Sequence, residues 1–336
     1  MQDKCLNFCT LFNIRYLTRG VAMYESLSKH CDNFHLYIFC FDNATHEVLS
    51  KIEMANVTLI ELVDFENERL LSVKNKRSLA EYCWTSTPFT ILHCLNNFDV
   101  DFCTYLDADI YFYSNPQVLL AELQGDSILI SPHRYTSKYD QSKISGKYCI
   151  QFNTFLNNDD GLAALNWWAD ACIDWCYAIP VNNKFGDQKY LDDWMERFDG
   201  VCELAHLGGG VAPWNVQQYS FKSCRSIMGS VNDSNETFEL VFYHFHGLDY
   251  ISNDCVTLGA YTLTESQINQ IYLPYIKHLE FLRSKFEISE HRSKKEKPSI
   301  LKWKNFYRIL TNPMSVWSFL LNKRTAKKNI VWINKL

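Results

Sequence analysis

The chain has 336 residues, of which 47% are hydrophobic and 21% charged, and its formal net charge is −5 at pH 7. This is the composition of an ordinary globular protein, and the length suffices for one large domain or two smaller ones. No stretch approaches the roughly 20 apolar residues that cross a bilayer, which excludes a transmembrane helix.

The first half of the chain alternates short apolar runs with amphipathic stretches. These predict strands at 5–12, 34–41 and 57–63, a strand running into a turn at 101–112, and helices at 16–31, 46–55 and 79–95, the last interrupted near Pro88. Strands that alternate with helices indicate an α/β fold with a mostly parallel sheet flanked by helices. No Gly-x-Gly-x-x-Gly or Walker A motif follows the first strand, which argues against a Rossmann dehydrogenase or a P-loop enzyme.

The second half of the chain is more mixed. We predict strands at 126–132, 148–156 and 240–247, a helix at 159–177 and a loop at Gly208–Gly210. From Thr264 to about Phe286, apolar residues at three and four spacing predict helix, and residues 291–299 have the composition of a linker.

The thirteen cysteines are odd in number and include no Cys-x-x-Cys pair. Cys172 and Cys176 lie four apart in a predicted helix, without the His or second Cys pair of a zinc site. The N-terminal residues lack the basic and apolar regions of a signal peptide. Unpaired thiols without an export signal predict a reducing compartment, so we expect a cytoplasmic protein.

The most informative motif is Tyr105-Leu-Asp-Ala-Asp-Ile-Tyr-Phe112, an apolar strand that runs into Asp-x-Asp. It places Asp107 and Asp109 at the carboxyl edge of a sheet, where open α/β folds bind ligands. Strand alternation would point both carboxylates to one ion, and hard oxygen ligands suit Mn²⁺ or Mg²⁺. A chance match is the alternative, and Asp99-Val-Asp101 is interpreted as such a solvated turn.

Five motifs in order give the chain a family likeness. They are LDADIYFYSNP at 106–116, FNTFLNN at 152–158, FGDQKYLDDW at 185–194, GGGVAPWN at 208–215 and VFYHFHG at 241–247. Through them, residues 5–260 resemble GT-A fold glycosyltransferases, particularly bacterial enzymes related to glycosyltransferase family 8. The resemblance implies a GT-A domain at 1–262, with a nucleotide-sugar half at 1–125 and an acceptor half at 126–262. A helical, basic C-terminal region then occupies 263–336.

The resemblance implies that His244 is the third protein ligand of the metal. By strand alternation His246 would share its face and would bind the diphosphate or be the true ligand; a buried structural His244 is the plain alternative. The chain continues Leu-Asp-Tyr after Gly247, where a Lys-Pro-Trp ending is common, so the basic residue that meets the leaving diphosphate is not identified.

The resemblance also places Asp187 and Gln188 beside the reacting sugar carbon and Asn153 on the bound sugar. Helix capping alone would equally explain Asp187. The expected nucleotide-sugar-binding residues are Asn13, Arg15, Asp42, Arg77, Ala108, Asn153, His246 and Gly247, and for the first four a plain surface residue is the alternative. Arg77 is the candidate for the phosphates, because a guanidinium pairs with phosphate oxygens in a fork. Trp214 and Asn215 are candidates for the acceptor pocket, with a core Trp as the alternative.

The predicted function is the metal-dependent transfer of a hexose or N-acetylhexosamine from a UDP-sugar to a glycan acceptor in bacterial surface polysaccharide synthesis. Similarity to family 8 implies retention of configuration; an inverting enzyme would need a base, for which Asp187 is the candidate. The alternatives are an inactive nucleotide-sugar-binding scaffold and a sugar-phosphate nucleotidyltransferase, although NIRYLTRG is not the Gly-rich loop of the latter. A glycosidase would set its carboxylates about 5–9 Å apart around the sugar.

The C-terminal segment has a separate character. From Arg283 to Leu336 there are 14 Lys and Arg against 3 Asp and Glu, while the rest of the chain has 19 against 35. The basic residues alternate with Trp303, Phe306, Tyr307, Trp317, Phe319 and Trp332. This pattern predicts docking to an anionic membrane surface, at the inner face of the cytoplasmic membrane, where a lipid-linked glycan would be the acceptor. Ordinary packing with a solvated basic face is the alternative, and the acidic body disfavours nucleic acid.

Overall fold

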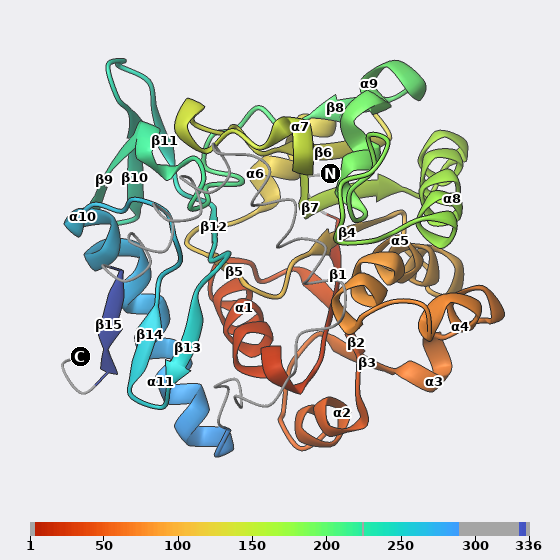
Figure 1. The fold of residues 1–336 in the computed structure, drawn as a ribbon, viewed down its shortest axis with the longest axis horizontal. Helices are drawn as coiled ribbons and strands as arrows, with labels where there is room; N and C mark the ends of the chain where they lie inside the picture. The colour runs from red at the N-terminus through yellow and green to blue at the C-terminus, as the bar shows by residue number, and fades with distance from the viewer. Residues whose placement is uncertain (1–3, 224, 289–328, 334–336) are drawn as a thin grey trace, which may run out of the picture. The chain divides into compact units, whose positions relative to one another are not determined.

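The computed structural model describes residues 4–223, 225–288 and 329–333, and the chain divides into two compact units, 1–244 and 245–336. The first unit is an α/β domain whose large, mostly parallel sheet is flanked by helices, as the sequence predicts (Figure 1). The predicted domain boundary at residue 262 stays a prediction.

The central sheet has seven strands among the described residues, in the order β3-β2-β1-β4-β7-β6-β8. Its strands are β1 (Leu6–Phe12), β2 (Phe34–Cys40), β3 (Val57–Glu61), β4 (Phe102–Leu106), β6 (Ile128–Pro132), β7 (Tyr148–Leu156) and β8 (Val201–Glu203). The pairs from β3 to β4 are parallel, β7 runs antiparallel to both β4 and β6, and β8 is parallel to β6. The reversed strand β7 therefore lies in the middle of an otherwise parallel sheet.

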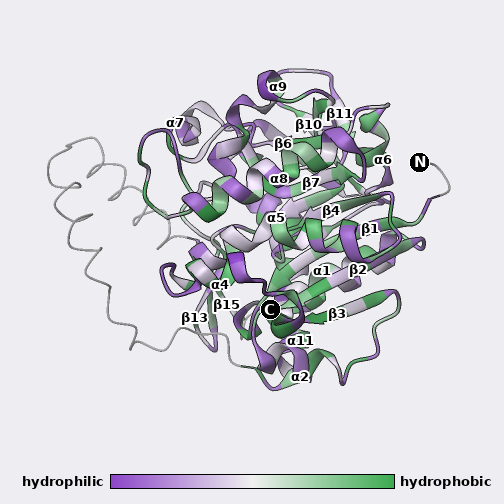
Figure 2. Cartoon of the chain, turned by 90° about the vertical axis from the view of Figure 1, so that its right-hand side faces the viewer, coloured by the Kyte–Doolittle hydropathy of each residue, from purple (hydrophilic) through white to green (hydrophobic). Residues whose placement is uncertain are grey.

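The strands are apolar on both faces because both faces are covered. Every residue of β1 is buried, and the central strands carry the hydrophobic colour along much of their length (Figure 2). Alternate residues, among them Cys9, Leu11, Tyr37 and Phe39, face one core. The cysteines of the described residues are free thiols, most of them buried, which is how small apolar side chains behave.

Helices α5 (Leu79–Asn97) and α8 (Asp159–Asp174) pack against each other and cover this face (Figure 1). A capping box of Ser78 and Glu81 begins α5. The predicted interruption of this helix is wrong, because α5 continues through Pro88. In the turn before it, the side chains of Thr85, Ser86 and Thr87 donate to the carbonyls four residues earlier, and burial against the sheet favours the continuous helix.

The opposite face of the sheet packs against α1 (Leu17–His30) and a two-stranded ribbon of β5 (Ile110–Phe112) and β12 (Phe242–His244). An aromatic contact joins the two layers, because the ring of Phe152 in the sheet lies 5.5 Å from that of Phe242 in the ribbon. Gly20 lets α1 approach the sheet, since a Cβ there would lie 2.4 Å from the Phe12 ring.

The remaining elements of the first unit are short. They are η1 (Ile14–Tyr16), α2 (Asn43–Leu49), α3 (Leu62–Phe65), α4 (Glu68–Lys74), α6 (Gln117–Leu120), η2 (Ala121–Leu123), η3 (Ser137–Tyr139), α7 (Ser142–Ser145), η4 (Gln188–Asp193), α9 (Trp194–Arg197), η5 (Val216–Gln218), β9 (Tyr219–Ser223), β10 (Ile227–Val231) and β11 (Thr237–Glu239). Strands β9 to β11 form an antiparallel sheet that the sequence analysis did not predict.

The second unit contains an antiparallel sheet of β13 (Asp249–Ser252), β14 (Cys255–Thr257) and β15 (Ile330–Trp332). The predicted helix from Thr264 is confirmed as α10 (Glu265–Gln267), a π-helical turn η6 (Ile268–Tyr272) and α11 (Leu273–Phe286). The predicted linker and most of the basic, aromatic segment lie outside the described residues. Within the described part of the chain, no helix combines the length and apolarity that a bilayer span requires.

Candidate metal centre and its surroundings

The structure brings together the three metal-ligand candidates of the first unit. The Nε2 atom of His244 lies 3.2 Å from Oδ1 of Asp109 and 3.8 Å from Oδ2 of Asp107. Asp107 follows β4 and Asp109 precedes β5, while His244 ends β12 and is paired with Ile110 of β5. The β5–β12 ribbon therefore sets the distance between the Asp-x-Asp segment and the histidine, although they are far apart in the sequence.

Strand alternation is not what aligns these side chains. Strand β4 ends at Leu106, and the two aspartates lie in a turn in which the backbone N–H of Ile110 donates to the carbonyl of Asp107 (3.3 Å). Strand β12 likewise ends at His244, so the predicted alternation does not extend to His246. His246 and Gly247 belong to the second unit, where Gly247 has a positive φ of 80°.

Gln151 of β7 orients the imidazole of His244. Its Oε1 lies 2.8 Å from Nδ1 of the ring, so Nδ1 donates a proton to Oε1 and Nε2 is the nitrogen that faces the aspartates. The Gln151 carbonyl also accepts from the backbone N–H of Asp107 (3.2 Å). A histidine whose second ring nitrogen donates to a fixed oxygen is the usual arrangement at metal sites.

Cys149 is a further group at this centre that sequence reasoning missed. A carboxylate oxygen of Asp107, the Cys149 sulfur and a ring nitrogen of His244 all lie within 4.8 Å of one another. The register of β7 with β6 shifts between Leu129 and Ser131, which marks a β-bulge or irregularity. Such irregularities redirect side chains near active sites, so regular alternation could not have located Cys149 or Gln151.

The negative charges of the centre belong to side chains that are only partly exposed to water. Burial raises the pKa of Asp107 to about 6, with a further rise from Asp109 and an opposing effect of His244. Burial alone would lower the pKa of His244, but the charges of Asp109 and Asp107 outweigh it and raise that pKa well above its usual value. Two carboxylates and an imidazole suit a divalent cation, which would take the place of the imidazole proton.

Asp187 is a second buried carboxyl of the first unit. Its residue is 5% exposed, and its pKa is raised to about 7, first by burial and then by the charge of Asp107. It precedes η4 without a side-chain capping bond, so helix capping does not explain it. A carboxyl whose pKa lies near neutrality in a protein interior is a candidate for a functional role.

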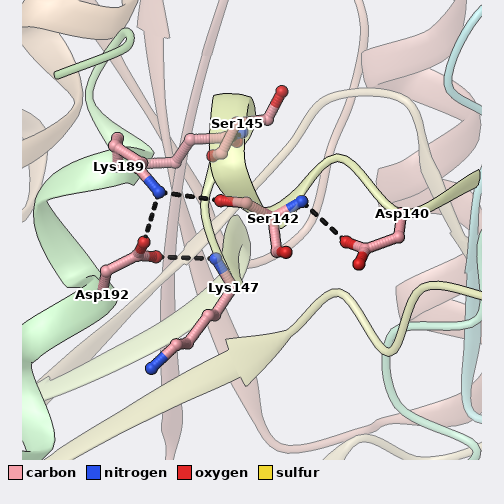
Figure 3. Close-up of polar contacts among 7 residues, drawn as sticks. Asp140, Ser142, Ser145, Lys147, Lys189 and Asp192 are labelled. Atoms are coloured by element: carbon pink, nitrogen blue, oxygen red, sulfur yellow. Dashed lines mark hydrogen bonds and ion pairs between the residues drawn. The ribbon is translucent and has the colours of Figure 1, made fainter. Parts of the chain in front are cut away.

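A polar network fixes the segment that follows Asp187 (Figure 3). The Nζ of Lys189 donates to Oδ2 of Asp192 (2.6 Å) and to the carbonyl of Ser142 (2.7 Å), while Oδ1 of Asp192 accepts from the N–H of Lys147 (2.6 Å). Gln188 adds a bond from Nε2 to the Ser145 carbonyl (2.6 Å). Residues 142–147 are thereby tied to η4.

The other candidates for sugar contact are fully or nearly buried. Asn153 accepts from the Ser131 N–H (2.9 Å), and its Nδ2 has no partner among the described residues. Trp214 and Asn215 both donate to the His133 carbonyl (2.8 Å each), and the Trp214 ring stands edge-on to His244 at 5.3 Å. Trp214 therefore forms a wall beside His244.

The candidates for the nucleotide occupy two places. Near the ends of β1 and β2, Asn13 caps η1, Arg15 is exposed, and Asp42 accepts from the N–H groups of Ile14 (3.1 Å) and Thr45 (2.8 Å). Ala108 is buried between the two aspartates. Elsewhere, Arg77 donates to the Ile173 carbonyl (3.1 Å) and stacks on the Tyr177 ring at 3.8 Å. Its guanidinium is thus engaged at the end of α8, and its phosphate role stays a prediction.

Comparison with known proteins places the chain among bacterial relatives. It is 32% identical to the uncharacterized protein YfnF of Bacillus subtilis (strain 168) over 295 residues, which cover 83% of this chain and 95% of YfnF. The chain belongs to the YfnF family. A second member, YfnD of the same organism, is 31% identical over 285 residues, which cover 82% of this chain and 88% of YfnD. No protein-family model matches the sequence.

Solved structures similar to this YfnF-family chain are glycosyltransferases. One is galactosyltransferase LgtC in complex with donor and acceptor sugar analogues, with a TM-score of 0.49 and 13% identity over 82% of this chain and 95% of LgtC. Another is GlyE of Streptococcus pneumoniae TIGR4, with a TM-score of 0.48 and 11% identity over 88% of this chain and 66% of GlyE. Membership of the chain in glycosyltransferase family 8 stays a prediction.

Proposed function

We propose that the chain is a metal-dependent glycosyltransferase that moves a hexose or N-acetylhexosamine from a UDP-sugar to a glycan acceptor with retention of configuration. The observation that carries this proposal is that the Nε2 atom of His244 lies within 4 Å of a carboxylate oxygen of both Asp107 and Asp109, at the end of β4. Ligands of open α/β sheets bind at this edge, and this set of donors suits an ion that holds a diphosphate.

Asp107, Asp109 and His244 would hold Mn²⁺ or Mg²⁺. When bound, the ion supplies the positive charge that stabilises the diphosphate as it leaves. Gln151 keeps the Nε2 lone pair of His244 directed at the ion through its bond to Nδ1. The Trp214 ring next to His244 limits the movement of the imidazole.

Asp187 and Gln188 are the candidates for the residues beside the anomeric carbon. A carboxylate in a buried position interacts strongly with the positive character that develops at that carbon. The bonds of Lys189 and Gln188 to residues 142–145 would hold this segment in place during the reaction. Asn153 would contact the bound sugar, and Trp214 and Asn215 would shape the acceptor side.

The nucleotide would lie along the ends of β1 and β2. There Asp42 joins the loops that follow the two strands, and Asn13 and Arg15 of the first loop would contact the base and ribose. Ala108, between the metal-binding aspartates, would face the ribose and diphosphate, and Arg77 remains the candidate cation for the phosphates.

The acceptor is proposed to be a lipid-linked glycan of bacterial surface polysaccharide synthesis. The support for this is the basic and aromatic character of the C-terminal sequence, which suits an anionic membrane surface. The enzyme would then work as a peripheral protein at the inner face of the cytoplasmic membrane.

The test is release of UDP from a panel of UDP-hexoses and UDP-N-acetylhexosamines with Mn²⁺, measured with and without glycan acceptors. Asp109→Asn removes one charged ligand, and we expect turnover to fall by at least about 100-fold, the size of loss typical for one electrostatic contact. The melting temperature should change little, because the variant keeps the size of the side chain.

Asp99→Asn is the matched control, because Asp99 is exposed and belongs to the second Asp-x-Asp of the chain. It should retain full turnover. An Asp109→Asn protein as active as the wild type would refute the metal role. Binding of UDP-sugar without any turnover would instead identify an inactive scaffold.

A further inference from the structure

Besides the two carboxylates and the imidazole, the candidate metal centre contains the sulfur of a cysteine. Cys149 is 4% exposed, and its sulfur lies within 4.8 Å of both an Asp107 oxygen and a His244 ring nitrogen. Neither the sequence motifs nor the family resemblance assigns this cysteine a role. An ion held by Asp107 and His244 would therefore have a thiol within reach.

The geometry directs these groups to one region. The Nδ1 atom of His244 is engaged by Gln151, so Nε2 is the nitrogen that faces the aspartates. Cys149 also interacts with the His244 side chain. The sulfur, the imidazole and the Asp107 carboxylate converge, although Cys149 and Gln151 lie on β7, Asp107 follows β4 and His244 ends β12.

A thiolate changes which ions the centre prefers. Carboxylate oxygens suit Mn²⁺ and Mg²⁺, whereas a mixed set of sulfur, nitrogen and oxygen suits Zn²⁺ and Co²⁺. We propose that Cys149 is a fourth protein ligand, through which the centre binds Zn²⁺ or Co²⁺ in a mode distinct from Mn²⁺ or Mg²⁺. On binding, the S–H bond of Cys149 breaks, the sulfur donates its electron pair to the ion, and the proton passes to solvent.

This mode has a functional consequence. A four-coordinate zinc held by four protein side chains is a closed site, whereas a catalytic ion keeps a position for substrate. Zn²⁺ bound through Cys149 would leave no place for a diphosphate oxygen and would act as an inhibitor. The inference rests on the proposed function in that Asp107, Asp109 and His244 are taken to hold the working ion.

The experiment is a titration of the purified full chain with Co²⁺ in the absence of donor. We expect ligand-field bands in the visible range together with a thiolate-to-cobalt charge-transfer band in the near ultraviolet. Cys149→Ser should lose the charge-transfer band. Its affinity for Zn²⁺ should fall by more than the roughly 10–100-fold that loss of an outer-shell partner causes, with a much smaller change for Mn²⁺.

Cys31→Ser is the matched control, because Cys31 is equally buried, at 4% exposed, and follows α1. It should keep the band. Cobalt bound without a thiolate band in the wild type, no cobalt binding at all, or equal losses of Zn²⁺ and Mn²⁺ affinity would each overturn the inference. If Cys149→Ser does not fold, protection of Cys149 from alkylation by Zn²⁺ is measured by mass spectrometry in the wild type, and an unprotected thiol has the same meaning.

The inference and the proposed function can fail separately. Turnover of a UDP-sugar with Mn²⁺ but no cobalt–thiolate band removes only the role of Cys149. A thiolate band in a protein that turns over none of the donor panel removes only the glycosyltransferase proposal.

Discussion

The buried carboxyl of Asp187 should make the protein less stable as the pH rises. We consider the variant Asp187→Asn, studied in buffer with a chelator so that no divalent ion contributes. The residue is 5% exposed and accepts hydrogen bonds from Thr87 and from backbone N–H groups. An asparagine has nearly the same shape and keeps an oxygen for these bonds, so the substitution removes the charge and little else.

The magnitude follows from the raised pKa. Burial and the charge of Asp107 raise the pKa of Asp187 from 3.8 to about 7, a change of about three units. At about 1.4 kcal/mol per unit, the ionised carboxylate destabilises the folded state by up to about 4 kcal/mol. For a domain of this size that corresponds to roughly 8–16 °C in melting temperature as an upper bound.

The sign depends on which state binds the proton. Below about pH 4 the carboxyl is protonated in both the folded and the unfolded chain, and the variant gains nothing. Between about pH 4 and pH 7 the unfolded chain ionises first, so the wild type loses stability as the pH rises. Above about pH 7 both states are ionised and the full penalty is present, so Asp187→Asn should be the more stable protein there.

The assay is thermal unfolding of the wild type and the variant at a series of pH values from 5 to 8. The difference in melting temperature should grow with pH in favour of Asp187→Asn. Asp174→Asn is the control, because the Asp174 side chain is 76% exposed, and it should show no such trend. A difference that is constant with pH, or a variant less stable than the wild type at pH 8, would refute the assignment of a raised pKa to Asp187.

A further substitution and a deletion test separate parts of the structure. Gln151→Leu removes the partner of His244 Nδ1, and Mn²⁺ affinity measured by calorimetry should fall about 10–100-fold; an unchanged affinity would mean that Gln151 does not orient the ring. Deletion from Pro298 removes most of the basic and aromatic segment and should weaken co-sedimentation with anionic vesicles. Equal sedimentation of the full and shortened chains would contradict membrane docking.

Much of the fold could be predicted because the spacing of apolar residues along the sequence reflects which side of a helix or strand is buried. The apolar runs at 5–12 and 148–156 became β1 and β7, since a strand covered on both faces needs apolar residues along its length. Asp107 and Asp109 could be identified from the end of a strand and the residues that follow it. Their proximity to His244 was expected only through the family resemblance, because the pairing of β5 with β12 joins segments more than 120 residues apart.

The features that the sequence did not predict have specific physical causes. Helix α5 passes through Pro88 because tertiary burial and side-chain hydroxyl bonds outweigh the local preference of proline. Cys149 and Gln151 were missed because the register of β7 with β6 is irregular. The two-residue alternation of a regular strand therefore does not predict which way their side chains point. The burial of Asp187 depends on how α5, α8 and the segment before η4 pack against one another. For example, Nε1 of Trp168 in α8 donates a hydrogen bond to the backbone carbonyl of Asp187 (2.9 Å).

The unusual pKa values at this centre have a common origin. Asp107 and Asp109 lie beside the imidazole of His244, and the charge of Asp107 adds to the effect of burial on Asp187. Without a cation the protein reduces this negative charge by holding protons, which is why the pKa values of Asp107, Asp187 and His244 are all raised. A divalent cation would lower the energy of the ionised carboxylates directly. The raised pKa values and the proposed affinity for a cation therefore have the same electrostatic origin, which is the proximity of carboxylates in a partly buried region.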